Sequence, residues 1–221
     1  MTASSPIALG ALASAYVKAK TKVLAAGYGD EIIWQRNLRG EDVTEHGFLK
    51  ECAWVILSSG MRESVVRKKF PDISEAFFNW SSAEEIVWHH ERCVSSALVF
   101  FRHERKIEAI AQCARIVHAK GFGTLREELA LNPIAVLQKF PYMGPATSYH
   151  AAKNIGFSVA KPDRHLCRIA ELSGYQDPSD LCKALAEYIG DPIAVVDVVL
   201  WRFATLQHDY MISFLTTKAD A

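Results

Sequence analysis

Apolar residues recur every three or four positions along most of this chain, the spacing that places them on one face of an α-helix. In 104–118, for example, Ile107, Ile110, Ala111, Ala114 and Val117 form one apolar stripe. Similar patterns predict helices near 7–26, 45–59, 62–69, 83–101, 123–131, 134–140, 145–155, 164–173, 179–189 and 193–206. The β-branched run at 195–199 would also suit a strand, but no partner strand is evident. We therefore expect an all-α fold, a compact bundle of about ten helices that could divide into two lobes.

Several helix starts are marked by residues that accept hydrogen bonds from free backbone amides. Asn132, Asp177 and Asp191 each precede a proline, which is well tolerated at the first helical position. Ser82 is followed three residues later by Glu85, as in a capping box. These patterns predict four helix starts.

The length, hydrophobic content and net charge of the chain indicate how large a core it can form and how it could bind nucleic acid. With 221 residues, half of them hydrophobic, the chain is long enough to bury a substantial core. We treat 1–221 as one unit; a division into lobes would fall near 100–104 and again after about 175. Lys plus Arg (25) equal Asp plus Glu (25), so any affinity for nucleic acid must come from a local patch.

The cysteines and the apolar segments indicate the cellular compartment in which the protein is expected. Its five cysteines are scattered and form no C-x-x-C pair, which is typical of reduced thiols in a cytoplasmic protein. No apolar segment is long enough to cross a bilayer, so we expect no membrane partner. The expected location is cytoplasmic, and nucleoid-associated in a bacterium. The basic stretch 102–106 is interpreted as a solvated turn.

A helix, a tight turn and a second helix are predicted over 134–156. The first helix ends at Phe140, the turn comprises 141–144, and Pro145 begins a helix that runs to Gly156. Gly144 is expected to adopt backbone angles that other residues avoid, so that the amides of the second helix's first turn point outward. Such amides bind anions, here a DNA phosphate, whatever the base sequence. The alternative is an ordinary turn between helices that binds no ligand.

After the loop at 157–162, Asp163 occupies the cap position of the next helix. A carboxylate beside a phosphate site repels the ligand, but it helps if positive charge develops there during a reaction. Cleavage of an N-glycosidic bond gives the sugar oxocarbenium character, which a fixed carboxylate stabilises. Asp163 is therefore our candidate catalytic residue. The alternative is that it serves only as a helix cap.

These segments resemble two motifs of the helix-hairpin-helix (HhH-GPD) DNA glycosylase superfamily, which includes endonuclease III and the 3-methyladenine DNA glycosylases. The stretch 140–148, FPYMGPATS, occupies the frame of the family's L-P-G-V-G-x-K-T-A, and 162–168, PDRHLCR, that of V-D-x-H-v-x-R. A weaker likeness at 54–65, WVILSSGMRESV, extends the resemblance to about 45–175.

The resemblance implies a monofunctional DNA glycosylase of base excision repair. Such an enzyme flips a damaged or modified base out of double-stranded DNA and hydrolyses its N-glycosidic bond, with Asp163 as the catalytic carboxylate. Gly60 stands where the family often has glutamine, so Met61 or Arg62 would fill the gap left by the base. The DNA backbone would be held by hairpin residues Pro141, Tyr142, Met143, Gly144, Ala146 and Thr147.

The resemblance also implies a base pocket and a bound ion. Trp34, Trp54, Tyr149 and His150 are the candidate pocket walls, because a flipped base needs flat stacking partners. In relatives a monovalent cation is often bound at the hairpin, and the matching carbonyls here are those of Gln138, Phe140 and Met143. We expect the protein to act as a monomer.

Departures from the family pattern narrow the chemistry. The lysine that forms a Schiff base in bifunctional members is replaced by Ala146, although Lys153 or Lys161 could provide an unconventional AP-lyase step. No cysteine follows Cys182, so no iron-sulfur cluster is expected, and the His89, His90 and Cys93 group lacks a second ligand pair for zinc. We therefore expect no cofactor. A non-catalytic helix-hairpin-helix DNA-binding protein remains the alternative from another class.

Overall fold

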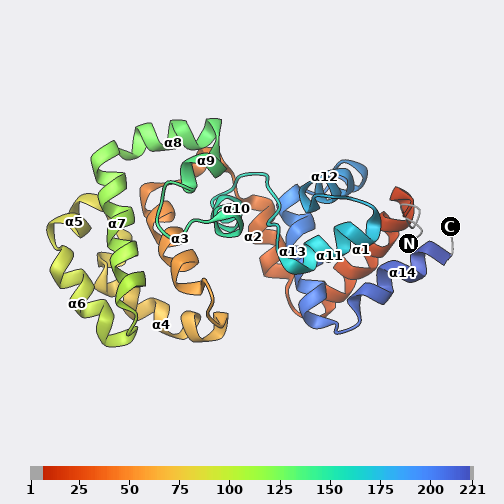
Figure 1. Ribbon diagram of the computed structural model, residues 1–221, viewed down its shortest axis with the longest axis horizontal. Helices are drawn as coiled ribbons and strands as arrows, with labels where there is room; N and C mark the ends of the chain where they lie inside the picture. Colours follow the sequence, from red (N-terminus) through yellow and green to blue (C-terminus); the bar gives the residue numbers. More distant parts are fainter. Residues whose placement is uncertain (1–6, 220–221) are drawn as a thin grey trace. The chain divides into compact units, whose positions relative to one another are not determined.

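The computed structural model describes residues 7–219, and this part of the chain is helical, without strands (Figure 1). The predicted all-α fold is confirmed, but the described residues form fourteen α-helices and two short 3₁₀ helices rather than about ten. The segment expected at 83–101 is two helices that meet at His89. Helices at Gly29–Asn37 and Tyr210–Ala219 were not predicted. Only Ile32 and Gln35 of the former are buried, too few to give a visible apolar stripe.

The chain separates into two units at 38/39 and 156/157. This differs from the expected boundaries near 100–104 and 175, because the division depends on packing between distant segments and no linker composition marks it. The described part of the first unit comprises 7–38 and 157–219, and the second unit comprises 39–156.

The first unit contains the helices from both ends of the chain. They are α1 (Leu9–Ala25), α2 (Gly29–Asn37), α11 (Arg164–Ser173), α12 (Pro178–Ile189), α13 (Ile193–Leu206) and α14 (Tyr210–Ala219). The central helix is α13, which packs against each of the other five. Its valine-rich stretch 195–199 is buried, which confirms a helix rather than a strand.

The second unit is formed by the central part of the chain. It contains η1 (Gly40–Asp42), α3 (Glu45–Ser58), α4 (Glu63–Ala76), η2 (Phe78–Trp80), α5 (Ala83–Trp88), α6 (His90–Phe100), α7 (Glu104–Lys120), α8 (Phe122–Leu131), α9 (Pro133–Leu137) and α10 (Pro145–Asn154). Helix α3 is central and contacts α4, α7 and α10. Helix α4 continues past the predicted end at 69 and includes Pro71.

The residues at which the chain enters and leaves the second unit lie together. Helix α10 ends at Asn154 rather than at Gly156, and Gly156 has a φ of 98°. A Cβ atom at Gly156 would overlap the backbone of Arg39 and Gly40. Glycine is therefore required at 156 by both the backbone angle and the close approach.

Three of the four predicted helix caps are confirmed. Asn132, Asp177 and Ser82 each accept a hydrogen bond from an amide in the first turn of α9, α12 and α5, respectively. The prediction for Asp191 is wrong, because Pro192 occupies the cap position of α13 and no side chain caps that helix.

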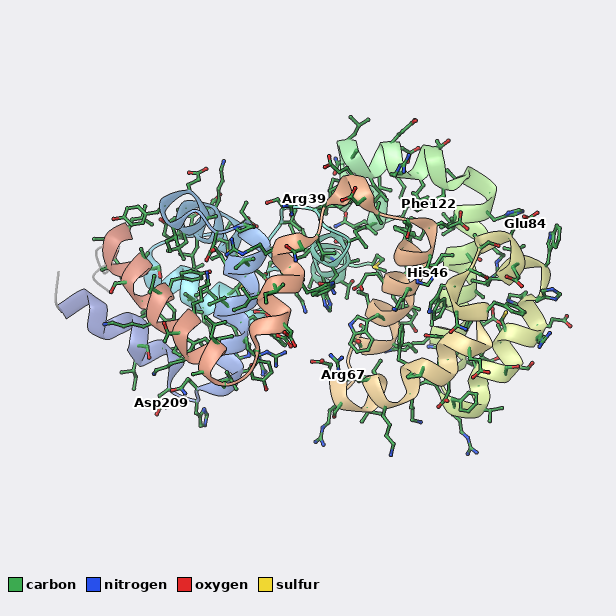
Figure 2. All side chains as sticks on the ribbon, turned by 180° about the vertical axis from the view of Figure 1, so that it is seen from behind. Arg39, His46, Arg67, Glu84, Phe122 and Asp209 are labelled. Atoms are coloured by element: carbon green, nitrogen blue, oxygen red, sulfur yellow. The ribbon has the colours of Figure 1, made fainter. Side chains whose placement is uncertain are left out.

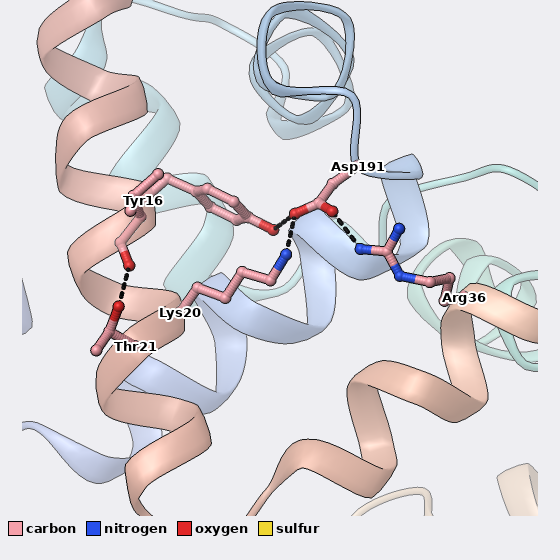
Figure 3. A network of polar contacts seen from close by, with 6 residues as sticks. Tyr16, Lys20, Thr21, Arg36 and Asp191 are labelled. Carbon is pink, nitrogen blue, oxygen red and sulfur yellow. Dashed lines mark hydrogen bonds and ion pairs between the residues drawn. The ribbon is translucent and has the colours of Figure 1, made fainter.

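Asp191 instead joins the first helices of the chain to the α12–α13 connection (Figure 3). One carboxylate oxygen accepts hydrogen bonds from the Tyr16 hydroxyl at 2.7 Å and the Lys20 ammonium at 2.6 Å, and the other pairs with Arg36. Burial alone would raise the pKa of Asp191, but the bonds from Lys20, Tyr16 and Arg36 outweigh it and lower that pKa. The pairing satisfies a carboxylate that is 7% exposed.

Replacing Asp191 with asparagine is expected to lower the free energy of unfolding by about 3 kcal/mol, because Lys20 and Arg36 lose their buried counter-charge. In thermal denaturation at pH 7 the melting temperature should fall by roughly 10 °C. Since the pKa of Asp191 is lowered in the folded state, the parent should lose this advantage only as the pH falls below about 4.

The matched control is Glu63→Gln, which breaks the exposed pair with Arg67 one helical turn away. Such pairs contribute about 0.5 kcal/mol or less. A similar change in melting temperature for the two variants would contradict the special role of Asp191.

Candidate functional site

The predicted hairpin has a well-defined turn between α9 and α10. Helix α9 ends at Leu137 rather than at the predicted Phe140. The Met143 amide donates to the Phe140 carbonyl at 3.2 Å, which closes a β-turn over 140–143. Pro141 occupies the second position of this turn and Tyr142 the third, with a φ of 62°. A positive φ at the third position is characteristic of a type II turn, in which glycine is usual.

The prediction that Gly144 adopts backbone angles avoided by other residues is therefore wrong. Gly144 has a φ of −73° and a ψ of −175°, extended angles that any residue adopts. A Cβ atom there would come no closer than 3.8 Å to the Thr147 hydroxyl, an ordinary contact. The left-handed conformation falls on Tyr142, two residues earlier, and the fold itself does not require glycine at 144.

The first turn of α10 contains backbone amides that have no acceptor within the helix, as at every helix start. The amides of Gly144, Ala146 and Thr147 precede the first intrahelical bond, in which Ser148 donates to the Gly144 carbonyl at 2.9 Å. The Thr147 hydroxyl donates to the Tyr142 carbonyl at 2.7 Å. This bond fixes the strained residue of the turn to the start of the helix, so the donors are held in place before any ligand binds.

An open hollow of about 510 Å³ lies beside this turn. It is lined by Ser59, Phe140, Tyr142, Met143, Gly144, Pro145, Ala146 and Thr147. Ser59 is the residue that follows α3, so the hollow joins the hairpin to the α3–α4 connection. The two residues proposed to replace the flipped base, Met61 and Arg62, are exposed on that connection.

Lys106 supports this region, which sequence analysis did not foresee. The solvated-turn interpretation of 102–106 fails at this residue, which is 4% exposed. Its ammonium donates to the carbonyls of Leu57 at 2.8 Å and Ser59 at 2.5 Å, at the end of α3, and lies 6.0 Å from the centre of the Tyr142 ring. Burial lowers the pKa of Lys106. The only available signal was its place beside Ile107 at the start of the apolar stripe.

Asp163 caps α11, as predicted. Its Oδ1 atom accepts hydrogen bonds from the His165 amide at 2.9 Å and the Leu166 amide at 3.0 Å. Both bonds use the same oxygen, and no bond to Oδ2 is present among the described residues. The side chain is partly exposed. A carboxylate oriented by two amides through one oxygen leaves the other oxygen able to face a substrate.

His165, in the first turn of α11, contacts a side chain of α14. The His165 ring is 3.2 Å from the Tyr210 hydroxyl through Nδ1. Burial lowers the pKa of His165, while the neighbouring Asp163 opposes that shift. Near pH 7 the lowered pKa favours the neutral imidazole.

The four candidate pocket residues come from three helices, α2, α3 and α10. Trp54 is only partly buried on α3; its ring meets Phe70 edge-on at 5.2 Å, and the Arg67 guanidinium lies 5.3 Å from the ring centre. Arg67 is labelled on α4 in Figure 2. Tyr149 and His150 are partly exposed on α10. Trp34, on α2 of the other unit, is 46% exposed. Their role in base binding stays a prediction.

The candidate residues divide between the units. The hairpin, Met61, Arg62 and three of the pocket candidates belong to 39–156, whereas Asp163 and Trp34 belong to the unit formed by both ends of the chain. Among the described residues no group of three or more His, Cys, Asp or Glu could hold a metal ion. The cation at the carbonyls of Gln138, Phe140 and Met143 stays a prediction.

We also compared the chain with known proteins. No protein-family model matches the sequence, and no curated protein or solved structure is significantly similar to it. Within the part of the chain that the structure describes, no helix is long and apolar enough to cross a membrane.

Proposed function

We propose that this protein is a monofunctional DNA glycosylase that hydrolyses the N-glycosidic bond of a damaged base flipped out of duplex DNA. The observation that carries the proposal is the hairpin. Its sequence fits the glycosylase motif, and Tyr142, at the position where that motif has glycine, has the left-handed backbone that glycine adopts easily. Asp163 follows in the expected order and caps a helix through one oxygen.

The hairpin supports binding of the DNA backbone. The amides of Gly144, Ala146 and Thr147 would donate to a phosphate without reading the bases. This mode suits a chain of zero formal net charge, which has no general attraction for DNA. Met61 or Arg62, exposed on the α3–α4 connection to which the hollow-lining residue Ser59 belongs, would fill the space left by the extruded nucleotide.

Asp163 supplies the chemistry in this proposal. The bond between C1′ and the base nitrogen breaks, its electron pair leaves with the base, and positive charge develops on the sugar. The carboxylate of Asp163 stabilises that charge and orients a water molecule. The water oxygen bonds to C1′, and its proton is passed to the departing base, leaving an abasic site.

A panel of duplex oligonucleotides, each with one defined lesion, tests the proposal. The expected result is strand breakage only after alkali treatment, for one class of lesion, because a monofunctional enzyme leaves the DNA backbone intact. Breakage without alkali, together with an adduct trapped by borohydride, would instead indicate a lyase that uses an unconventional lysine. No excision from any lesion, despite duplex binding, would contradict the proposal and favour a binding protein.

Gly144 offers a direct test of phosphate binding. Because the fold tolerates a Cβ atom there, Gly144→Ala should fold normally, and Gly144→Glu should weaken duplex binding by about tenfold or more through bulk and negative charge. Titration of the variants with fluorescently labelled duplex measures both affinities.

The control for this test is Gly123→Glu, which places the same charge in open space on α8. Equal losses of affinity in the two glutamate variants would indicate general repulsion, and would argue against phosphate binding at the hairpin.

A further inference from the structure

A carboxyl group is buried in the apolar helix α13. Asp197 is 1% exposed and has buried valines on both sides along the chain, Val195, Val196, Val198 and Val199. Burying a carboxyl group is unfavourable unless it is hydrogen-bonded. The Oδ2 atom of Asp197 accepts a hydrogen bond from the Lys161 amide at 2.6 Å. A residue of the helical core thus holds the backbone of the loop that precedes Asp163.

That contact is connected to Asp163 by a short and stiff piece of backbone. The Asp163 amide donates to the Lys161 carbonyl at 2.8 Å, which closes a three-residue turn centred on Pro162. Proline fixes its own φ, and it also restricts the residue before it. Ala160, immediately before Lys161, is fully buried. Few backbone rotations therefore remain between the Asp197 contact and Asp163.

We propose that Asp197 is a positioning residue that holds the Asp163 carboxylate in its working orientation. Asp163 is then fixed from both sides, by the Lys161 turn before it and by the amides of His165 and Leu166 after it. This inference rests on the proposed function in so far as Asp163 is the catalytic group. The hydrogen bond that transmits the effect is measured independently of catalysis.

The decisive variants are Asp197→Leu, which removes the acceptor, and Asp197→Asn, which keeps a weaker, neutral one. Displacement of a catalytic group by about 1 Å can lower a rate by about 100-fold, so the leucine variant should lose single-turnover excision on that scale. Its affinity for duplex DNA should stay unchanged, because the hairpin lies in the other unit. The asparagine variant should recover most of the rate. Ser158→Ala, an exposed change in the same loop, should have no effect.

Amide hydrogen exchange measured by NMR separates this inference from the proposed function. Loss of the acceptor should increase exchange of the Lys161 amide by about tenfold, with a smaller increase at Asp163, while Val199 stays protected. If the parent excises no base but the exchange changes as expected, the positioning contact stands and the proposed function fails. Unchanged Lys161 exchange in the leucine variant would overturn the inference.

If Asp197→Leu fails to fold, the inference is tested with Asp197→Asn instead. Its weaker acceptor should still increase Lys161 exchange several-fold relative to the parent and to Ser158→Ala. Equal exchange in these three proteins would overturn the inference. Equal excision rates in the parent and in a folded leucine variant would also overturn it.

Discussion

Replacing Asp163 with asparagine is expected to lower the single-turnover rate of base excision by about 1,000-fold while duplex binding is retained. A neutral amide cannot stabilise the positive charge that develops on the sugar. Asparagine is, however, a good helix cap, and its side-chain oxygen can accept the bonds from the His165 and Leu166 amides. Removing a negative charge near the DNA backbone should leave binding equal or slightly stronger. Quenched-flow excision and fluorescence titration measure the two effects.

Asp177→Asn is the matched control for this prediction. Asp177 caps α12 of the same unit and accepts a hydrogen bond from the Ser179 amide at 2.7 Å, so the substitution has the same local chemistry at a different helix. It should leave the excision rate unchanged. If Asp163→Asn also excises at the parental rate, Asp163 is a structural cap and the catalytic proposal is wrong.

The predictions that succeeded rest on local physical chemistry. Periodic apolar residues identified most helices, and the caps at Asn132 and Asp177 depend only on a side chain and the amides that follow it. The cap at Asp163 was predictable for the same reason. Its interpretation as a catalytic residue rests on the chemistry of a carboxylate that two amides hold through one oxygen.

The predictions that failed depend on contacts between distant residues. Asp191 has the local pattern of a cap, yet its carboxylate binds Tyr16, Lys20 and Arg36, and no side chain caps α13. Lys106 belongs to a basic stretch, and only the packing of α7 against α3 shows that its ammonium binds the end of α3. The division at 38/39 and 156/157 likewise follows from packing alone.

The hairpin shows a failure of a different kind. The sequence predicted the turn at 141–144, one residue later than the observed 140–143, and it assigned the unusual backbone angle to the glycine at 144 rather than to Tyr142. Glycine is the residue that most often has a positive φ. Here the Phe140–Met143 turn and the Thr147 hydrogen bond impose a positive φ on Tyr142 instead. For Asp197 a signal was present, since an acid within a run of valines is unusual in a core helix.

The carboxyl group of Glu51 connects the hairpin's second helix to the centre of its unit. Glu51 on α3 accepts a hydrogen bond from the Asn154 side chain at the end of α10, at 2.7 Å. Burial raises the pKa of Glu51 from 4.5 to about 8, although the Asn154 bond and the charges of Lys153 and Lys50 oppose the shift. The folded protein therefore keeps a proton on Glu51 at pH values where the unfolded chain releases it.

Glu51→Gln is expected to stabilise the protein at alkaline pH. Because the folded-state pKa is raised, the parent loses stability as the pH rises from about 4.5 to about 8, with no further loss from this group above that range. Each pKa unit corresponds to about 1.4 kcal/mol, so the glutamine variant should be more stable at pH 9 by about 3–5 kcal/mol. Its melting temperature at pH 9 should exceed that of the parent by roughly 10 °C, with little difference at pH 4.

Glutamine keeps an oxygen acceptor for Asn154, so the comparison isolates the charge rather than the hydrogen bond. Glu127→Gln, an exposed substitution on α8, provides the control and should follow the parent at every pH. If Glu51→Gln and the parent lose stability in parallel between pH 5 and 9, Glu51 already carries its charge in the folded state. The end of α10 would then be held to α3 by an ionised carboxylate, and alkaline pH would not loosen the helix that begins at the hairpin.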